Sequence, residues 1–167
     1  YDVSPIEDVN TTVTSVTTTS REAYTRDNKE VQALMEKLEP AEDFYRVEKK
    51  TRKTKNDGAW MNFPSVSLFS STANADLTKF FKRMGCEAST NAYSITGSTP
   101  LVDSLLSVRY ALYSEYIPNT DLVNYIQESG GTYLYENLYT LPLGFVLPYD
   151  LADNWQYQME NPAEVQN

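Results

Sequence analysis

The chain has 167 residues, of which 41% are hydrophobic, and a formal charge of −9, which suits one domain of ordinary size with a substantial core. Its 23 acidic residues outnumber 14 basic ones, which excludes general nucleic-acid binding because that function needs a basic surface. Histidine is absent and Cys86 is the single cysteine, which excludes Ser-His-Asp and Cys-His catalytic sites, an internal disulfide and cysteine-rich zinc sites, so we expect neither a metal nor a cofactor.

Residues 1–26 form the first of three predicted regions, an extended lead-in rich in threonine, whose β-branched side chain favours extended backbone. A mixed α/β domain over residues 27–150 and a polar tail over residues 151–167 follow. The sequence starts without an initiator methionine or a signal peptide, and it has no apolar run of about 18 residues that could span a bilayer. The simplest interpretation is a piece of a longer protein.

A first helix is predicted from Asp27, because Asp27 followed by Glu30 matches a capping box. One apolar stripe at helical spacing follows, and it consists of Val31, Leu34, Met35 and Leu38. Pro40 ends this helix, and the alternating residues 43–48 (DFYRVE) then predict a strand.

Five basic side chains crowd the segment that leads from this strand to the turn residues Asn56-Asp57-Gly58. They are Lys49, Lys50, Arg52, Lys53 and Lys55. The favoured interpretation is a solvated loop or hairpin tip. The alternative is contact with an anionic membrane surface or a polyanionic polymer.

Residues 60–71 predict one broken strand, with Pro64 weakening its first half. Asn74 is predicted to cap a second helix that ends at Gly85. Cys86 should pack as a small hydrophobe, and residues 93–97 should be extended.

A third helix is predicted with Thr99 as its cap and Pro100 at its first position, where no N–H is needed. A strand over residues 107–114 follows, and then a helix over residues 121–128 that Gly130-Gly131 ends. The last predicted strands cover residues 132–139 and 143–147 and are joined at Leu141-Pro142.

Strands and helices thus alternate, with several strands not separated by helices. This order predicts an α/β (α+β) fold, a single domain in which three to four helices pack on a mixed β-sheet.

Glycoside hydrolysis needs two carboxylates placed across a sugar. Four acids lie near the ends of predicted elements, namely Asp103, Glu115, Glu136 and Asp150. Sequence spacing brings no two of them together, and among 23 acidic residues such placement arises by chance, so a hydrolytic pair is the less favoured interpretation.

Four residues are the candidate ligand contacts: Trp60, Tyr93, Arg109 and Tyr133. Exposed aromatic rings stack on sugars, although packing in the core and sheet is favoured for most of the 13 tyrosines. Arg109 should point away from the side on which Val108 and Tyr110 lie. It either pairs with a nearby carboxylate, which is the favoured interpretation, or binds an anionic group.

Three segments together resemble the YfhO family of bacterial multi-spanning membrane proteins, a branch of the GT-C-like glycosyltransferases. They are FYRVE (44–48) with the Asn-containing turn and SLFSS (67–71) after it, GSTPLVDSLLSVRYAL (97–112), and YENLYTLPLGFVLP (135–148). The resemblance covers residues 27–150. Two positions depart from the family pattern, since Leu138 stands where proline is often seen and Ser107 where glycine is often seen.

The resemblance implies a lipid-linked sugar transferase that acts outside the cell on teichoic-acid-type polymers of a Gram-positive envelope. The catalytic acid of such proteins is expected on a loop between membrane helices, so no catalytic residue carries over to this chain. The leading hypothesis is therefore a non-catalytic extracytoplasmic domain at the cell membrane. It would position an acceptor polymer or a lipid-linked sugar, and its partner would be the remainder of the parent protein.

Two other hypotheses stay open. One is a carbohydrate-binding module that uses exposed aromatic side chains. The other is a stand-alone hydrolase that uses a carboxylate pair.

Overall fold

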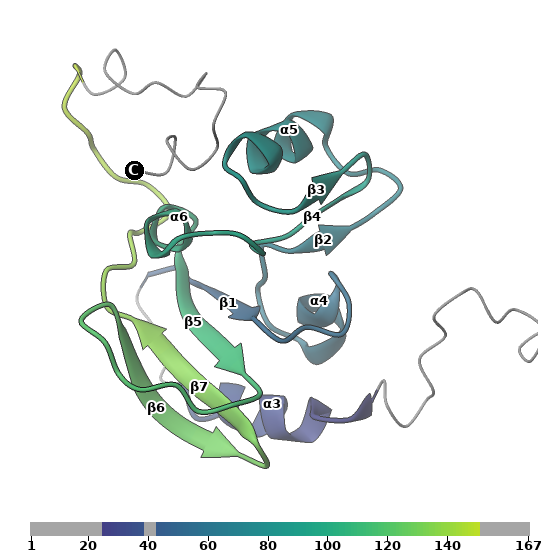
Figure 1. Cartoon of the computed structure of the whole chain (residues 1–167), viewed down its shortest axis with the longest axis vertical. Helices are drawn as coiled ribbons and strands as arrows, with labels where there is room; N and C mark the ends of the chain where they lie inside the picture. Colours follow the sequence, from purple (N-terminus) through teal and green to yellow (C-terminus); the bar gives the residue numbers. More distant parts are fainter. Residues whose placement is uncertain (1–24, 39–42, 151–167) are drawn as a thin grey trace, which may run out of the picture.

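The computed structural model describes residues 25–38 and 43–150, along which helices and strands alternate (Figure 1). Nearly all of the Thr-rich lead-in and the whole polar tail lie outside the described residues. The predicted fold class is confirmed, since the described residues form an α+β fold in which helices pack against one mixed and one antiparallel sheet.

The larger sheet has four strands in the order β1-β5-β7-β6. These are β1 (Arg46–Lys49), β5 (Val108–Tyr113), β7 (Thr132–Asn137) and β6 (Val123–Ser129). β1 runs parallel to β5, whereas β5–β7 and β7–β6 are antiparallel, so the sheet is mixed.

Two helices cover one face of this sheet, α3 (Asn28–Met35) and the short α4 (Asp57–Met61). The buried residues of this first core cluster are Val31, Leu34, Val47, Met61, Phe63, Tyr110, Leu112 and Leu134. The α3 members are two of the four residues predicted to form the first apolar stripe, and Met35 and Leu38 pack at the edge of the cluster.

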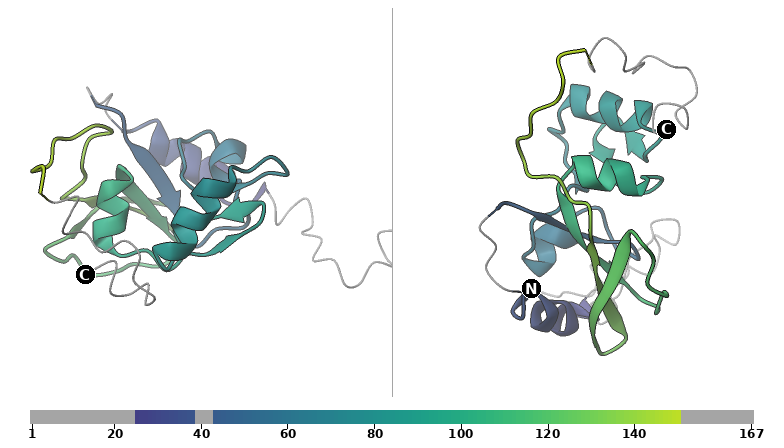
Figure 2. Two further views of the ribbon diagram at one scale, coloured as in Figure 1. Left: turned by 90° about the horizontal axis from the view of Figure 1, so that it is seen from above. Right: turned by 90° about the vertical axis from the view of Figure 1, so that its left-hand side faces the viewer.

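A second, three-stranded antiparallel sheet has the order β2-β4-β3, with β2 (Leu68–Phe69), β4 (Ala92–Tyr93) and β3 (Ala88–Ser89). It packs with α5 (Ala75–Arg83) and α6 (Pro100–Leu105) around a second core cluster (Figure 2). That cluster consists of Phe81, Met84, Cys86, Tyr93, Ile95 and Val102. Cys86 is buried, as predicted, and burial raises the pKa of its thiol to about 11.

Two predicted caps are confirmed. Asn74 accepts hydrogen bonds from the backbone N–H groups of Asp76 (2.8 Å) and Leu77 (3.2 Å) at the start of α5. Thr99 caps α6, with Pro100 inside the first turn. Gly85 follows α5 with a φ of 76°, the left-handed conformation that ends helices.

The capping box at Asp27 is wrong. Asp27 itself adopts a left-handed conformation, with a φ of 66°, and its side chain makes no cap hydrogen bond. Its carboxylate instead faces Lys49 and Lys53, at 3.9 Å and 3.7 Å. A long-range charge contact therefore replaces the local contact that the sequence motif predicts.

The helix predicted over residues 121–128 is also wrong, because this segment forms strand β6. Gly130 and Gly131 have φ values of 54° and 83°, and two positive φ values in succession make the tight hairpin turn that joins β6 to β7. A register shift between Tyr125 and Gln127 interrupts the alternation of the strand. The apolar pairs in this segment therefore imitate helical spacing.

Two predicted strands need correction. Residues 57–61 form α4, so the broken strand predicted over residues 60–71 reduces to β2. Residues 143–147 form no strand, and most of their side chains are exposed. Pro142, Gly144 and Pro148 explain this result, because prolines lack a ladder donor and glycine weakens strands.

Ser107, the residue that stands where the resemblance expects glycine, has a φ of 57°. A left-handed conformation favours glycine, so the structure gives a physical reason for the expected residue type. Ser107 is buried between α6 and β5, and its carbonyl accepts a 2.7 Å hydrogen bond from the N–H of Arg46. This turn aligns the start of β5 with β1.

Candidate functional site

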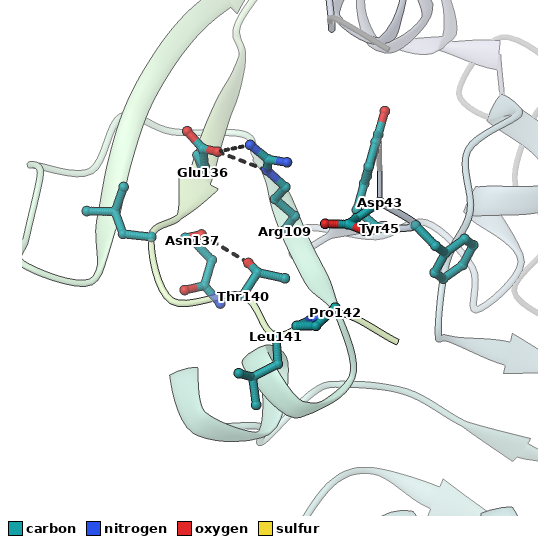
Figure 3. A pocket seen from close by; sticks show the side chains of 10 residues that line it. Asp43, Tyr45, Arg109, Glu136, Asn137, Thr140, Leu141 and Pro142 are labelled. Atoms are coloured by element: carbon teal, nitrogen blue, oxygen red, sulfur yellow. Dashed lines mark hydrogen bonds and ion pairs between the residues drawn. The ribbon is translucent and has the colours of Figure 1, made fainter. Parts of the chain in front are cut away.

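A cavity of about 260 Å³ lies where the lead-in to β1, the start of β5 and the end of β7 meet the chain that follows β7 (Figure 3). Its lining residues are Asp43, Phe44, Tyr45, Arg109, Glu136, Asn137, Leu138, Thr140, Leu141 and Pro142. The parallel pairing of β1 with β5 and the antiparallel pairing of β5 with β7 bring these distant segments together.

Arg109 and Glu136 form the charged centre of this cavity. The Nε and Nη2 atoms of Arg109 each lie 2.9 Å from Oε1 of Glu136. This hydrogen bond is the main cause of a raised pKa for the Arg109 guanidinium, which also lies over the Tyr110 ring. The prediction that Arg109 pairs with a nearby carboxylate is confirmed.

A strand irregularity accompanies this pair. Arg46 pairs with Val108 whereas Val47 pairs with Tyr110, so Arg109 is the extra residue of a bulge between β1 and β5. Bulges change the direction of a side chain and often occur beside functional sites. Val108 and Tyr110 are buried and Arg109 is half-buried, which agrees with the expected alternation.

The rest of the lining combines polar and apolar groups. Asn137 is fixed by hydrogen bonds from its Nδ2 atom to the Ser104 hydroxyl (3.2 Å) and the Val108 carbonyl (3.3 Å). The Thr140 hydroxyl donates to the Asn137 carbonyl over 3.0 Å, as Figure 3 shows. Phe44 and Leu138 are half-exposed and supply an apolar surface. The cavity therefore offers a cation, carboxylates, amide and hydroxyl groups, and an apolar wall.

Sequence reasoning missed most of this cavity. It named Arg109 as a candidate ligand contact and Glu136 as a possible catalytic acid, but it did not place Asp43 or Phe44 near either of them. The available signal was that DFYRVE and YENLYTLPLG both lie at predicted strand ends. Their strands, β1 and β7, both pair with β5, and pairing between segments that are far apart in the sequence has no local signal.

The candidate acids do not all fall in one place. Glu136 lies in the cavity, together with Asp43. Asp103 lies in a separate cavity of about 160 Å³, where it accepts hydrogen bonds from Lys50 (2.7 Å) and Ser98 (2.6 Å). A hydrolytic pair stays a hypothesis.

The five basic residues that run from Lys49, the last residue of β1, to Lys55 all meet carboxylates. Lys49 and Lys53 face Asp27, Lys50 pairs with Asp103, and both Arg52 and Lys55 contact Glu87. Lys49 is buried, and burial lowers the pKa of its ammonium group against the opposing effect of Asp27. These contacts join α3, α6 and the β3 region to the segment, so its charges are largely neutralised from within. Contact of this segment with a membrane or polyanion stays a prediction.

Glu87 meets two cations and the Ser94 hydroxyl in this network. Hydrogen bonds from Lys55 and Ser94, with the nearby Arg52 charge, lower its pKa from 4.5 to about 2. A lowered pKa in the folded state contributes stability above the unfolded-state pKa, and this contribution is lost as the pH falls through the folded-state value.

We therefore expect Glu87→Gln to reduce the free energy of unfolding at pH 7 by up to about 1 kcal/mol, because the carboxylate is partly exposed and its ion pairs are screened. The difference from the wild type should shrink as the pH falls from 4.5 towards 2. Urea unfolding at a series of pH values measures it. Glu115→Gln, at an exposed position, serves as the control, and a Glu87→Gln difference that stays constant with pH would contradict the prediction.

The aromatic candidates occupy three different environments. Trp60 lies on α4 and is half-exposed. Tyr93 is buried and stacks on Phe81 at 4.6 Å, so the exposed ring expected at this position is wrong, because β4 faces the second core cluster. Tyr133 lies in a group of tyrosine rings that contact one another; the others are Tyr113, Tyr125 and Tyr135 of the same sheet and Tyr116 of the β5–β6 connection.

The described residues, 25–38 and 43–150, contain no group of three His, Cys, Asp or Glu side chains that could hold a metal ion. None of the helices in this part of the chain has the length and apolar character that crossing a bilayer requires. No curated protein and no solved structure matches the chain. The family model of the bacterial membrane protein YfhO does match, over residues 6–167. The match covers nearly the whole sequence, so the chain belongs to the YfhO family of bacterial membrane proteins.

Proposed function

We propose that this chain is the extracytoplasmic, non-catalytic part of a membrane glycosyltransferase that modifies teichoic-acid-type polymers of the cell envelope. In this role it binds the acceptor polymer or the lipid-linked sugar and positions it for a catalytic acid elsewhere in the parent protein. Membership of a membrane-protein family supports the membrane part of the proposal. The cavity beside Arg109 supports the binding part.

The chemistry of the cavity is the observation that carries this proposal. A sugar ring presents hydroxyl groups at its edge and C–H groups on its faces, so its site needs hydrogen-bonding groups beside an apolar wall. The cavity provides both, with Arg109, Glu136, Asn137 and Thr140 as polar groups and Phe44 as part of the wall. Its volume of about 260 Å³ lies just below the roughly 300–1,000 Å³ of drug-sized ligand pockets, which suits one sugar unit.

Arg109 also suits the phosphate groups of such ligands. A guanidinium has five N–H donors, and the ion pair with Glu136 engages two of its nitrogen atoms, Nε and Nη2. Arginine is the preferred residue for planar recognition of phosphate. An anionic sugar phosphate could therefore bind beside Glu136 through the remaining donors.

We expect Arg109→Ala to weaken binding of a polyol-phosphate polymer or a sugar phosphate about 10-fold to 100-fold, the loss typical of a charge-assisted hydrogen bond. Isothermal titration of the wild type and the variant measures this change. Arg83→Ala is the matched control, because it removes the same charge from α5 and Arg83 does not line the cavity. Equal affinities for the wild type and Arg109→Ala would contradict the proposed site.

A carbohydrate-binding module that uses aromatic rings is the second candidate function. The observation that favours it is the exposure of Trp60 on α4 and of Tyr116 at the edge of the tyrosine group. The same titrations separate the two candidates. Binding lost in Trp60→Ala and kept in Arg109→Ala would favour the aromatic module.

A further inference from the structure

The chain after β7 carries an uncharged, largely exposed stretch, residues 138–149 (LYTLPLGFVLPY), here called the apolar segment. It contains no Asp, Glu, Lys or Arg, although charged residues make up 22% of the chain. Val146 is 98% exposed, Tyr149 95% and Leu143 64%. Isolated exposed apolar residues are ordinary, but a continuous uncharged run of them marks an interaction site.

The apolar segment is anchored to the body at its beginning. The N–H of Leu138 donates to the Leu122 carbonyl over 3.0 Å, and the N–H of Leu141 donates to the Ser104 carbonyl over 3.2 Å. From there it runs along the outer side of α6 at one edge of the molecule, as Figures 1 and 2 show. A flat surface could therefore reach the segment.

We propose that the apolar segment docks on the lipid–water interface of a membrane. The chain belongs to a family of membrane proteins, so a bilayer is a surface available to it. The composition suits the interface, because leucine, valine and phenylalanine side chains enter the acyl boundary while the tyrosines Tyr139 and Tyr149 lie at headgroup level.

The backbone limits how deeply this segment enters the bilayer. Its residues after Leu141 form neither helix nor strand, and irregular backbone exposed to lipid is not tolerated in the hydrocarbon core. Pro142 and Pro148 remove two N–H donors, which lowers the cost of partial burial. Shallow insertion into the interface meets both conditions.

Charge argues against two alternatives, a second copy of the chain on the apolar segment and lipid binding by the basic residues 49–55. A second copy of the chain would bring together two molecules of formal charge −9, which repel each other. Attraction of anionic lipid by the basic residues 49–55 would need cationic groups that are free to meet it. The five lysines and arginines of these residues instead face carboxylates. α4, which follows these residues, lies away from the apolar segment in Figure 1. Docking by the apolar segment should therefore depend little on lipid charge.

A consequence concerns the cavity beside Arg109. Leu138, Thr140, Leu141 and Pro142 belong both to the apolar segment and to the cavity lining. Docking of the segment would place the cavity next to the headgroups, where the sugar of a lipid-linked donor lies. This consequence rests on the proposed function, whereas vesicle binding does not.

The test is co-sedimentation of the 167-residue chain with vesicles of phosphatidylcholine, and with vesicles that also contain phosphatidylserine. We expect binding to both, and at least about a tenfold weaker partition for the double variant Leu143→Ser, Val146→Ser. The control double variant Phe69→Ser, Leu77→Ser changes two exposed apolar residues on β2 and α5 and should bind like the wild type. In Tyr149→Trp, tryptophan emission should shift to shorter wavelength when phosphatidylcholine vesicles are added.

Three results would overturn the proposal. They are no binding of the wild type to either vesicle, equal binding by the wild type and the Leu143→Ser, Val146→Ser variant, and binding that requires phosphatidylserine and disappears at high salt. Concentration-dependent dimerisation that the same double variant abolishes, without vesicle binding, would show that a second copy covers the segment. Loss of sugar-phosphate binding in Arg109→Ala tests the cavity separately, so failure of one proposal is distinguishable from failure of the other.

Discussion

Glu48→Ala is expected to reduce the free energy of unfolding by about 3–5 kcal/mol. Glu48 lies on β1 and is 2% exposed. Its Oε1 atom accepts hydrogen bonds from the Ser65 hydroxyl (2.8 Å) and from the N–H groups of Val66 (2.5 Å) and Ser67 (2.9 Å), and its Oε2 atom accepts one from the Ser67 hydroxyl (3.0 Å). Alanine would leave these donors without their acceptor.

The cost is large because these bonds connect the two halves of the fold. β1 belongs to the four-stranded sheet, whereas Val66 and Leu68 pack at the edge of the second core cluster. A total stability of about 5–15 kcal/mol is typical of a domain, so the loss would unfold a substantial fraction of the molecules under mild denaturant.

Glu48→Gln provides the matched control. Glutamine keeps one oxygen acceptor, and its NH₂ group can donate to the Ser67 hydroxyl, so we expect a loss of about 1 kcal/mol. Urea unfolding followed by circular dichroism measures both variants. If the free energy of unfolding of Glu48→Ala lies within about 1 kcal/mol of the wild-type value, the buried carboxylate does not hold residues 65–67 in place.

Local signals in the sequence predicted the elements whose ends depend on neighbouring residues. Asn74 and Thr99 cap their helices with their own side chains, and Gly85 ends α5 with a positive φ. The strands 107–114 and 132–139 were predicted within two residues of β5 and β7. In these cases the deciding interactions lie within one turn or strand.

The failures occur where polar turn contacts and close packing, which apolar periodicity does not record, decide the local structure. Asp57 accepts hydrogen bonds from the N–H groups of Lys53 (2.7 Å) and Thr54 (2.8 Å), which closes the turn before α4. In that helix, a Cβ atom on Gly58 would lie 2.4 Å from Ser65 Cβ, so the close packing needs a residue without a side chain. Neither the turn nor the packing has a signature in the pattern of apolar residues.

The candidate site shows the same division. The sequence favoured a carboxylate partner for Arg109, because a lone arginine usually meets one, and Glu136 fills that role. The identity of the partner, and the presence of Asp43 and Phe44 beside it, follow from the order β1-β5-β7 in the sheet. Strand order depends on contacts between distant segments, so local sequence patterns do not reveal it.

Leu134→Ala is expected to reduce the free energy of unfolding by about 2–5 kcal/mol. Leu134 is fully buried on β7, paired with Leu112 of β5, and both belong to the first core cluster with Val31 and Leu34 of α3. The substitution removes apolar contacts on the sheet face that α3 covers and leaves a cavity between two layers that relax only partly.

Leu143→Ala makes the same chemical change at an exposed position of the apolar segment and should alter the free energy of unfolding by less than about 0.5 kcal/mol. Urea unfolding with a common slope compares the two variants. A similar loss in both would mean that the apolar segment is packed against the body, which would also remove the basis for its docking on lipid. We expect a large loss in the free energy of unfolding for Leu134→Ala and almost none for Leu143→Ala. That result would mean that Leu143 contributes little to the stability of the fold and is available to a surface outside the chain.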